Sequence, residues 1–224
     1  LASGDFVIWV FPNAGNPRKV QRYAAEWAQA LRRMEALKPE TLIPGHGPVV
    51  FGAERVARML SDGAEALEHL VRETLALMNA GATLEDVLSK VKVPASYLAK
   101  PYLLPKYDDP EFLVRSIYHL NAGWFDGNAP HLKPARTAEL AAELADLAGG
   151  ARKLAARAEA LAGQGQNRLA VALAELAAAA VPDDPQLQAI RAATLRKLID
   201  SENSLMGRAF LAVYEREAGG RSKV

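Results

Sequence analysis

The 224 residues have a mass of 24.1 kDa, above the usual size of a single domain, so two compact units are expected. Hydrophobic residues make up 50% of the sequence and charged residues 24%, a globular composition that excludes a largely disordered chain. The net charge of +1 gives no electrostatic signature of nucleic-acid or anionic-membrane binding, and the absence of cysteine excludes disulfides, thiolate zinc sites and a cysteine nucleophile.

The first fifty residues alternate between strand and helix patterns. The apolar and aromatic run 5–11 predicts a short strand, and the spacing of apolar residues predicts a helix over 22–37 that Pro39 ends. Residues 41–43 predict a second strand, which runs directly into the glycine-rich loop 44–48. Strand, helix, strand and glycine-rich loop are typical of an α/β layer rather than of a helical bundle.

Helical patterns dominate after Gly52. Apolar residues three and four apart predict one long helix that stops at Gly81, a residue type common just after a helix end. Thr83 and Asp86 resemble a capping box that opens a short helix to about residue 91. The proline-rich residues 94–109 predict an irregular crossing loop.

The next segment begins with a proline suited to the first helical position. Pro110 predicts the start of a helix through residue 119 that ends near Gly123, followed by an aromatic turn over 124–128. From residue 137 the sequence is rich in alanine and leucine, and breaks at 149–150, 163–165, 182–185 and near 201 predict four or five helices. Small alanines favour closely packed antiparallel pairs, similar to tetratricopeptide hairpins, but no strict repeat period predicts a solenoid.

No apolar stretch reaches the length of about eighteen residues that a membrane span needs; the longest, 169–181, is interrupted by Glu175. We therefore expect no membrane span. The sequence starts at Leu1 rather than at methionine and carries no signal-peptide pattern, so we expect it to be a piece of a longer protein.

Only one of the four histidines is a convincing candidate for metal binding. No two histidines are two or four residues apart, so neither an H-x-H pair nor an H-E-x-x-H helix can form, whereas a catalytic zinc typically takes about three protein ligands. His46 follows a predicted strand between two glycines and two prolines, so its ring can reach a metal or a substrate without steric competition. The alternative is a tight turn that happens to contain histidine. We expect His69 at the surface, and His119 and His131 have no metal-like partners nearby in the sequence.

Three further residues could bind an anion. Asn13 and Arg18 follow the first predicted strand and are expected at the same sheet edge as His46, where an amide and a planar guanidinium fork suit a tetrahedral oxyanion. The alternative is a turn asparagine and a solvated arginine. Tyr118 lies three residues after Arg115, on the same helical face, and its alternative is a core tyrosine.

Several of these segments form a recognisable pattern. They are Phe11-Pro12-Asn13 with Arg18, Leu42-Ile43-Pro44-Gly45-His46-Gly47, Leu77-Met78-Asn79-Ala80-Gly81, and Ile117-Tyr118 with Gly123-Trp124-Phe125-Asp126-Gly127-Asn128. Together they resemble the carboxyl-terminal part of alkyl sulfatases of the metallo-β-lactamase superfamily. The last segment is the most specific and is typical of the dimerisation region of that family, and the similarity extends to about Gly219.

The resemblance implies a fold that is mostly α overall. Residues 1–52 would be the α+β remnant of an αββα metallo-β-lactamase fold, forming the carboxyl-terminal part of the catalytic domain. Residues 53–219 would be an all-α helical dimerisation domain, and residues 220–224 a tail. The H-x-H-x-D-H motif and the metal-binding glutamates of the family would lie upstream of Leu1.

By the same resemblance, His46 matches the late zinc-ligand histidine of the family, and Asn13, Arg18 and Tyr118 match positions that contact the sulfate group, with Tyr118 assisting catalysis. The intact enzyme would hold two zinc ions, of which this chain supplies an incomplete site. The sequence departs from the family at Lys19, where a glycine is usual after the arginine, and at residues 14–17.

The leading hypothesis is therefore a zinc-dependent hydrolase of alkyl sulfate esters, active as a homodimer with the upstream catalytic segment and inactive as this chain alone. Two alternatives stay open: a dimerisation and interaction module without chemistry, and a superfamily hydrolase of a different ester, which the lysine at position 19 favours. The resemblance favours a periplasmic or secreted location.

Overall fold

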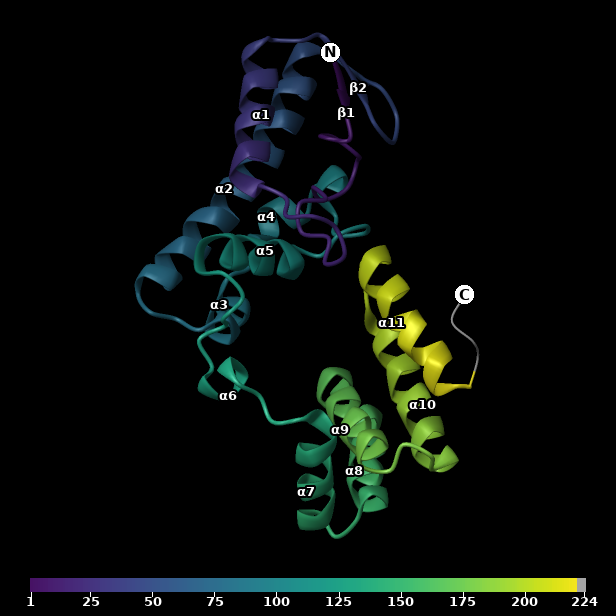
Figure 1. Cartoon of the computed structure of the whole chain (residues 1–224). Coiled ribbons are helices and arrows are strands. Elements are labelled where there is room, and N and C mark those ends of the chain that lie inside the picture. The colour runs from purple at the N-terminus through teal and green to yellow at the C-terminus, as the bar shows by residue number, and fades with distance from the viewer. Residues whose placement is uncertain (221–224) are drawn as a thin grey trace. The chain divides into compact units, whose positions relative to one another are not determined.

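A computed structural model describes residues 1–220. The chain divides into two compact units, unit 1 from Leu1 to Leu132 and unit 2 from Lys133 onward. Within the described residues the chain is mostly helical, with eleven α-helices and one small sheet, which confirms the prediction of a mostly α protein (Figure 1). Unit 1 contains β1 (Ala2–Gly4), α1 (Ala24–Ala36), β2 (Thr41–Pro44), β3 (Val50–Phe51), α2 (Ala53–Asn79), α3 (Leu84–Lys90), α4 (Ala95–Leu98), the 3₁₀ turn η1 (Pro101–Leu103), α5 (Pro110–Ala122) and α6 (Ala129–Leu132). Unit 2 contains α7 (Thr137–Leu147), α8 (Ala151–Gly163), α9 (Asn167–Ala180), α10 (Pro185–Ser201) and α11 (Leu205–Ala218).

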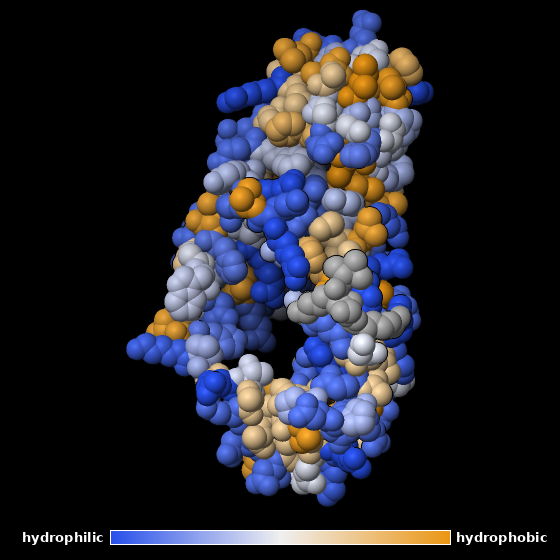
Figure 2. Space-filling view, turned by 45° about the vertical axis from the view of Figure 1, so that its right-hand side comes forward, coloured by the Kyte–Doolittle hydropathy of each residue, from blue (hydrophilic) through white to orange (hydrophobic). Residues whose placement is uncertain are grey.

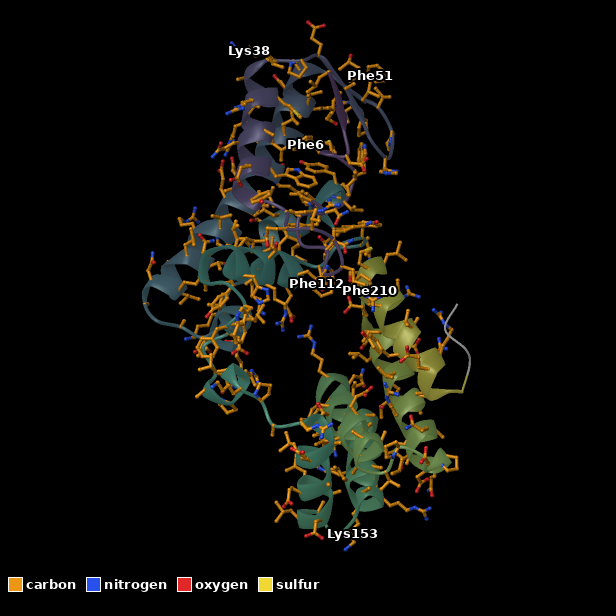
Figure 3. The ribbon with its side chains drawn as sticks, in the orientation of Figure 1. Phe6, Lys38, Phe51, Phe112, Lys153 and Phe210 are labelled. Carbon is orange, nitrogen blue, oxygen red and sulfur yellow. The ribbon has the colours of Figure 1, made fainter. Side chains whose placement is uncertain are left out.

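The sheet of unit 1 has three short strands in the order β1-β2-β3, with β1 parallel to β2 and β3 antiparallel to it. Its two faces differ in exposure. Leu42 and Val50 are buried on one face, whereas Ile43 and Phe51 are 51% and 65% exposed. Figure 3 marks Phe51 at the edge of the sheet, and Figure 2 shows hydrophobic surface at this end of unit 1. The sheet therefore carries an uncovered apolar face.

The strand predicted at 41–43 is confirmed as β2, but the strand predicted at 5–11 is wrong. Residues 5–11 form turns and bends, and the strand lies earlier, as β1. Gly4 and Trp9 have φ angles of 53° and 56°, which break an extended chain. The N–H of Phe11 donates to the carbonyl of Leu104 (3.0 Å), and its side chain is fully buried. The apolar run therefore fills the core without joining the sheet.

Helices α1 and α2 pack side by side, as Figure 1 shows, and confirm the two helices predicted there. Arg32 of α1 ties them together, because its guanidinium donates two hydrogen bonds to the carboxylate of Glu68 (3.0 and 2.9 Å) and one to Ser61 (2.8 Å) on α2. At Gly63 an added Cβ would lie 3.2 Å from the side chain of Leu31, so the missing side chain allows this close approach.

The core of unit 1 joins residues from both sides of position 52. Phe11 and Leu42 share it with Leu60 of α2 and Leu113 of α5. The predicted end of a catalytic domain at residue 52 stays a prediction, since this packing shows only that the two segments fold together. Of the predicted tail 220–224, all but Gly220 lies outside the described residues.

Local signals in the sequence identify the helix ends well. The predicted capping box is confirmed: Thr83 Oγ1 accepts from the N–H of Asp86 (3.2 Å), and the Asp86 carboxylate accepts from the N–H of Thr83 (3.2 Å). Pro110 starts α5 as predicted, with Asp109 as the N-cap. The crossing loop 94–109 is irregular except for the single turns α4 and η1.

Unit 2 consists of the five helices α7 to α11, with breaks at the predicted positions. Neighbouring helices pack closely because their contacts are made largely by alanine, such as Ala155 and Ala177 around Leu187. The N-cap of α10 is Asp184, whose carboxylate accepts from the N–H of Gln186 (2.9 Å).

Within residues 1–220, no helix combines the length and the hydropathy that crossing a lipid bilayer requires.

Candidate functional site

A cavity of about 390 Å³ in unit 1 brings two of the predicted site residues together. We call it the His46 cavity. Its wall includes charged, polar and apolar groups. Its lining residues are Asp5, Ile8, Val10, Asn13, Arg22, Trp27, His46, Lys106 and Tyr107.

The loop that carries His46 is held by backbone contacts on both sides. The N–H of Gly45 donates to the carbonyls of Gly4 (2.8 Å) and Val7 (3.0 Å). At the other side, Trp9 donates from Nε1 to the carbonyl of Pro48 (2.7 Å).

Both glycines next to His46 are sterically required. A Cβ on Gly45 would lie 2.7 Å from the carbonyl carbon of Gly4, and one on Gly47 would lie 2.3 Å from the Trp9 ring. Gly47 also has a φ of 90°, which other residues rarely adopt. The loop is therefore a fixed support for an imidazole that is 72% exposed.

Among residues 1–220, the acidic group that pairs with His46 is Asp5, whose Oδ1 lies 3.5 Å from Nε2 of the imidazole. These two side chains could supply two metal ligands. Over residues 1–220, no group of three or more histidine, aspartate or glutamate side chains is arranged to hold a metal ion. The described residues therefore do not complete a zinc site of the usual three protein ligands.

Asn13 lies on a loop that is anchored to two other elements. Its backbone carbonyl accepts a hydrogen bond from the Arg22 guanidinium (2.7 Å). Two residues later, the N–H of Gly15 donates to the Asp108 carboxylate (2.8 Å), and a Cβ on Gly15 would lie 2.3 Å from the backbone nitrogen of Leu113. The glycine therefore lets the loop press against the first turn of α5.

Oδ1 of the Asn13 side chain is buried and has no hydrogen-bond partner in the described part of the chain. A buried amide oxygen without a donor costs free energy, so such atoms in native structures call for an explanation, such as a bound ligand or water. Asn13 lines the His46 cavity, so a ligand bound there could reach its side-chain amide.

Burial raises the pKa of the Asp108 carboxyl to about 6, because the two backbone amides and the Arg22 charge that favour its ionised form only partly offset the loss of water. Its oxygens accept from the N–H groups of Gly15 and Asp109 (2.8 and 3.0 Å). Because Lys106 and Tyr107 directly precede it in the chain, Asp108 fixes one wall of the cavity to the Asn13 loop.

The arginine that joins His46 and Asn13 in the cavity is Arg22, not Arg18. The Arg18 side chain is exposed and does not line the cavity; its backbone N–H donates to Oδ1 of Asn16 (3.1 Å). Its role in sulfate binding stays a prediction. In the sequence Arg22 marks only the start of the predicted helix 22–37, although a cation at the junction of loop and helix is itself a signal.

Tyr118 does not line the cavity either. It is 5% exposed in the core of unit 1, with its ring edge against the His119 ring, which fits the core alternative, and its catalytic role stays a prediction. The side chains that the sequence analysis missed on this wall are Lys106 and Tyr107. The proline-rich loop around them gave no helical or strand pattern that could place them.

The remaining histidines have other surroundings. His69 is half-buried, with Nε2 3.0 Å from the carbonyl of Lys92, and His131 is paired with Asp126 (2.5 Å). His119 lines a separate pocket beside α5.

The His46 cavity combines charge and apolar surface in a way that suits an amphiphilic anion. Arg22 and Lys106 supply two positive charges against the single carboxylate of Asp5, which pairs with His46, whereas Ile8, Val10 and the ring of Trp27 supply apolar surface. Two contacts with Phe6 fix the Trp27 ring. Its Nε1 donates to the carbonyl of Phe6 (3.2 Å), and the two rings pack edge to face with their centroids 5.1 Å apart. Figure 3 shows Phe6 beside α1.

Comparison with known proteins assigns the family. The family model described as alkyl sulfatase dimerisation matches residues 83–220. A linear primary-alkylsulfatase of Pseudomonas sp. (strain ATCC 19151) is 32% identical over 175 residues, which cover 77% of this chain and 33% of that protein. An (R)-specific secondary-alkylsulfatase of Pseudomonas sp. is 29% identical over 170 residues, 75% of this chain and 26% of that protein.

Among solved structures, the stereoselective inverting sec-alkylsulfatase Pisa1 from Pseudomonas sp. superposes with a TM-score of 0.91 at 25% identity, over 99% of this chain and 36% of that chain. The chain thus spans about a third of the length of the relatives that it matches. Because the family model covers more than half of the sequence, the chain belongs to the alkyl sulfatase dimerisation family.

Proposed function

We propose that the protein to which this chain belongs hydrolyses the sulfate esters of alkyl alcohols. In this proposal the chain supplies groups that bind the sulfate, one zinc ligand and the surface for dimerisation. The observation that carries the proposal is the His46 cavity, where an exposed imidazole, two cations and an apolar wall meet. The alkylsulfatase names of the relatives support the same substrate class.

The charged part of the cavity would bind the sulfate group. The Arg22 guanidinium presents a planar fork of donors to sulfate oxygens, and Lys106 adds a second positive charge. These groups would also stabilise the negative charge that grows on the departing sulfate. The apolar wall of Ile8, Val10 and Trp27 would hold the first carbons of the alkyl chain, since burying apolar surface contributes about 25 cal/mol per Å².

Asn13 would bind the same sulfate through its amide. The oxygens of a sulfate ester only accept hydrogen bonds, and the buried Oδ1 of Asn13 is also an acceptor, so the two cannot bond to each other. Turning the amide by 180° exchanges oxygen and nitrogen with little change in shape, so Nδ2 would then donate to the ligand. Its loop is fixed by Arg22 and Asp108, so this donor would be in place before the substrate binds.

We further propose that His46 is one ligand of a zinc site in the intact protein. The described residues do not complete such a site, so the other ligands would come from outside them. When bound, zinc lowers the pKa of a coordinated water and so supplies a nucleophile near neutral pH.

The uncovered face of the sheet supports the placement of this site in a larger domain. Ile43 and Phe51 expose apolar surface on the face opposite the core. We propose that further strands of a metallo-β-lactamase-like domain cover this face, so that residues 1–52 would be the end of that domain, as the resemblance implies.

The test is metal analysis together with dodecyl sulfate hydrolysis by the intact protein and by this chain. We expect zinc and turnover in the intact protein and neither in this chain. Activity of this chain alone, or an intact protein that is inert towards all sulfate esters, would refute the proposal.

Variants of the intact protein then test the residues. We expect Arg22→Gln to lower kcat by about 10²–10³, the usual effect of removing one donor to a transition-state oxyanion, and the matched Arg18→Gln to have a much smaller effect. Tyr118→Phe tests the predicted catalytic tyrosine, and we expect it to retain most activity because Tyr118 does not line the cavity. A reversed order of the two arginine variants would assign the sulfate to Arg18.

A second function, compatible with the first, is dimerisation through this chain. The match of the dimerisation family to residues 83–220 favours a homodimer. Exposed leucines, such as Leu147 at 82% and Leu140 at 49%, offer apolar surface to a partner. Sedimentation of this chain tests it: we expect a dimer, and a strictly monomeric species at high concentration would contradict it.

A further inference from the structure

We propose that unit 1 carries a second anion site, separate from the His46 cavity, which binds a small tetrahedral oxyanion such as sulfate or phosphate. The site is a pocket of about 210 Å³ between the loop 15–22 and α5, and we call it the α5 pocket. This volume leaves room for a small anion.

One wall of the α5 pocket is a single face of a helix. Phe112, Arg115, Ser116 and His119 follow the i, i+3, i+4, i+7 spacing that places side chains on one side of an α-helix, and all four line the pocket. The stripe starts at Phe112 in the first turn of α5 (Figure 3). It offers a guanidinium, a hydroxyl and an imidazole, all of which can donate hydrogen bonds to an oxyanion.

The other wall is the loop 15–22, which is fixed to α5 at both ends. At one end Gly15 packs against the backbone of Leu113 and donates to Asp108. At the other end Gln21 donates from Nε2 to Oγ of Ser116 (2.8 Å) and to its carbonyl (3.2 Å). The pocket therefore exists before any ligand binds, which lowers the entropic cost of binding.

The charge of the α5 pocket favours an anion. Lys19, Arg22 and Arg115 line it, and none of its lining residues in the described chain is an aspartate or a glutamate. The nearby Asp108 carboxylate does not line the pocket, and its oxygens are engaged by the amides of Gly15 and Asp109. Three cations without a carboxylate partner in the pocket repel one another, and a bound dianion would relieve this repulsion.

The two cavities share only Arg22. The α5 pocket therefore can be tested without reference to hydrolysis, and the proposal stands or falls separately from the proposed function. His119 lines only the α5 pocket and His46 only the other cavity, so the two imidazoles are local reporters.

The experiment follows the imidazole resonances of this chain by NMR during titration with sodium sulfate, and in a second arm with sodium phosphate, at constant ionic strength set by sodium chloride. We expect a saturable shift of the His119 resonances, with at least a tenfold weaker affinity in Lys19→Gln/Arg115→Gln. The matched control Lys106→Gln removes a cation from the His46 cavity only and should leave the His119 titration within twofold. Equal responses to both anions assign a general oxyanion site, and a response to one assigns that anion.

Three outcomes would overturn the proposal. The first is a shift of the His119 resonances with chloride as large as that with sulfate, which would indicate screening alone. The second is sulfate binding by the double variant as tight as by the parent chain, with unchanged His46 resonances showing that the variant is folded. The third is loss of the His119 shift in Lys106→Gln but not in the double variant, which would place the anion in the other cavity.

Discussion

The two units of this chain reach their folded states by different means. Unit 1 is built around large side chains such as Phe11, Leu60 and Leu67, and it buries polar groups such as Asp108 that hold segments more than ninety residues apart in the sequence. Unit 2 packs helices that are neighbours in sequence through alanine contacts such as Ala155 and Ala177. Both cavities of the candidate sites lie in unit 1, where loops are held by contacts between residues far apart in the sequence.

The largest expected effect is a deletion in the core of unit 1. Leu60 is fully buried, so Leu60→Ala should lower the free energy of unfolding of unit 1 by about 2–5 kcal/mol through lost burial and the cavity left behind. All three tryptophans, Trp9, Trp27 and Trp124, lie in unit 1, so urea unfolding followed by tryptophan fluorescence reports on this unit alone. Leu37→Ala is the matched control, since Leu37 lies in the same unit and is 70% exposed. Equal urea midpoints for Leu60→Ala and the control variant would contradict the view that large buried side chains stabilise unit 1.

The next effect is a loss of stability with rising pH that Asp108 should confer on unit 1. The folded pKa of Asp108 is about 6, above its usual value of 3.8, so between these values the folded state binds more protons than the unfolded state. Stability from this group is therefore fully present below about pH 4 and is lost as the pH rises through about 6. The loss is about 3 kcal/mol at 1.36 kcal/mol per pKa unit.

The measurement is the difference in unfolding free energy between the parent chain and Asp108→Asn from pH 4 to pH 7, again by tryptophan fluorescence. The difference removes the opposite trend of carboxylates with lowered pKa, such as Asp86 and Asp126. We expect Asp108→Asn to gain stability relative to the parent as the pH rises. A constant difference over this range would show that burial does not perturb Asp108.

The same contrast explains what the sequence could predict. Helix boundaries depend on local signals, so the capping box at Thr83, the start at Pro110 and the breaks of unit 2 were all predictable. The prediction of a strand at 5–11 was wrong because an apolar run looks the same in the sequence whether a sheet or other tertiary contacts bury it. Here tertiary contacts bury residues such as Phe11. Which arginine reaches His46 depends on the path of the loop, and Gly15 and Asp108 fix that path across 93 residues.

Unit 2 should be sensitive to larger side chains between its closely packed helices. Ala170 and Ala174 are 0% and 1% exposed on α9, and their small size sets the distance to the neighbouring helices. Ala174→Leu should therefore destabilise unit 2 by about 1–3 kcal/mol, measured as the loss of helical circular dichroism on heating. The tryptophan-detected unfolding of unit 1 should not change, whereas a simultaneous shift of that signal would show that the two units unfold together. Ala179→Leu is the control, because Ala179 lies on the same helix but is only half-buried, and we expect it to destabilise unit 2 less.

The smallest expected effect is the loss of stability when one helix N-cap is removed in each unit. Asp184 accepts from the N–H groups of Gln186 and Leu187 at the start of α10 and also pairs with Arg152, so Asp184→Ala should cost unit 2 about 1 kcal/mol. Thr83→Ala removes the corresponding cap of α3 in unit 1, with a loss of similar size. Circular dichroism should detect both losses, but tryptophan fluorescence only that of Thr83→Ala, because the cap at Asp184 supports helices of a unit that contains no tryptophan. If both variants moved the fluorescence midpoint equally, the caps would act on one cooperative structure, and the division of the chain into two independently stabilised units would be wrong.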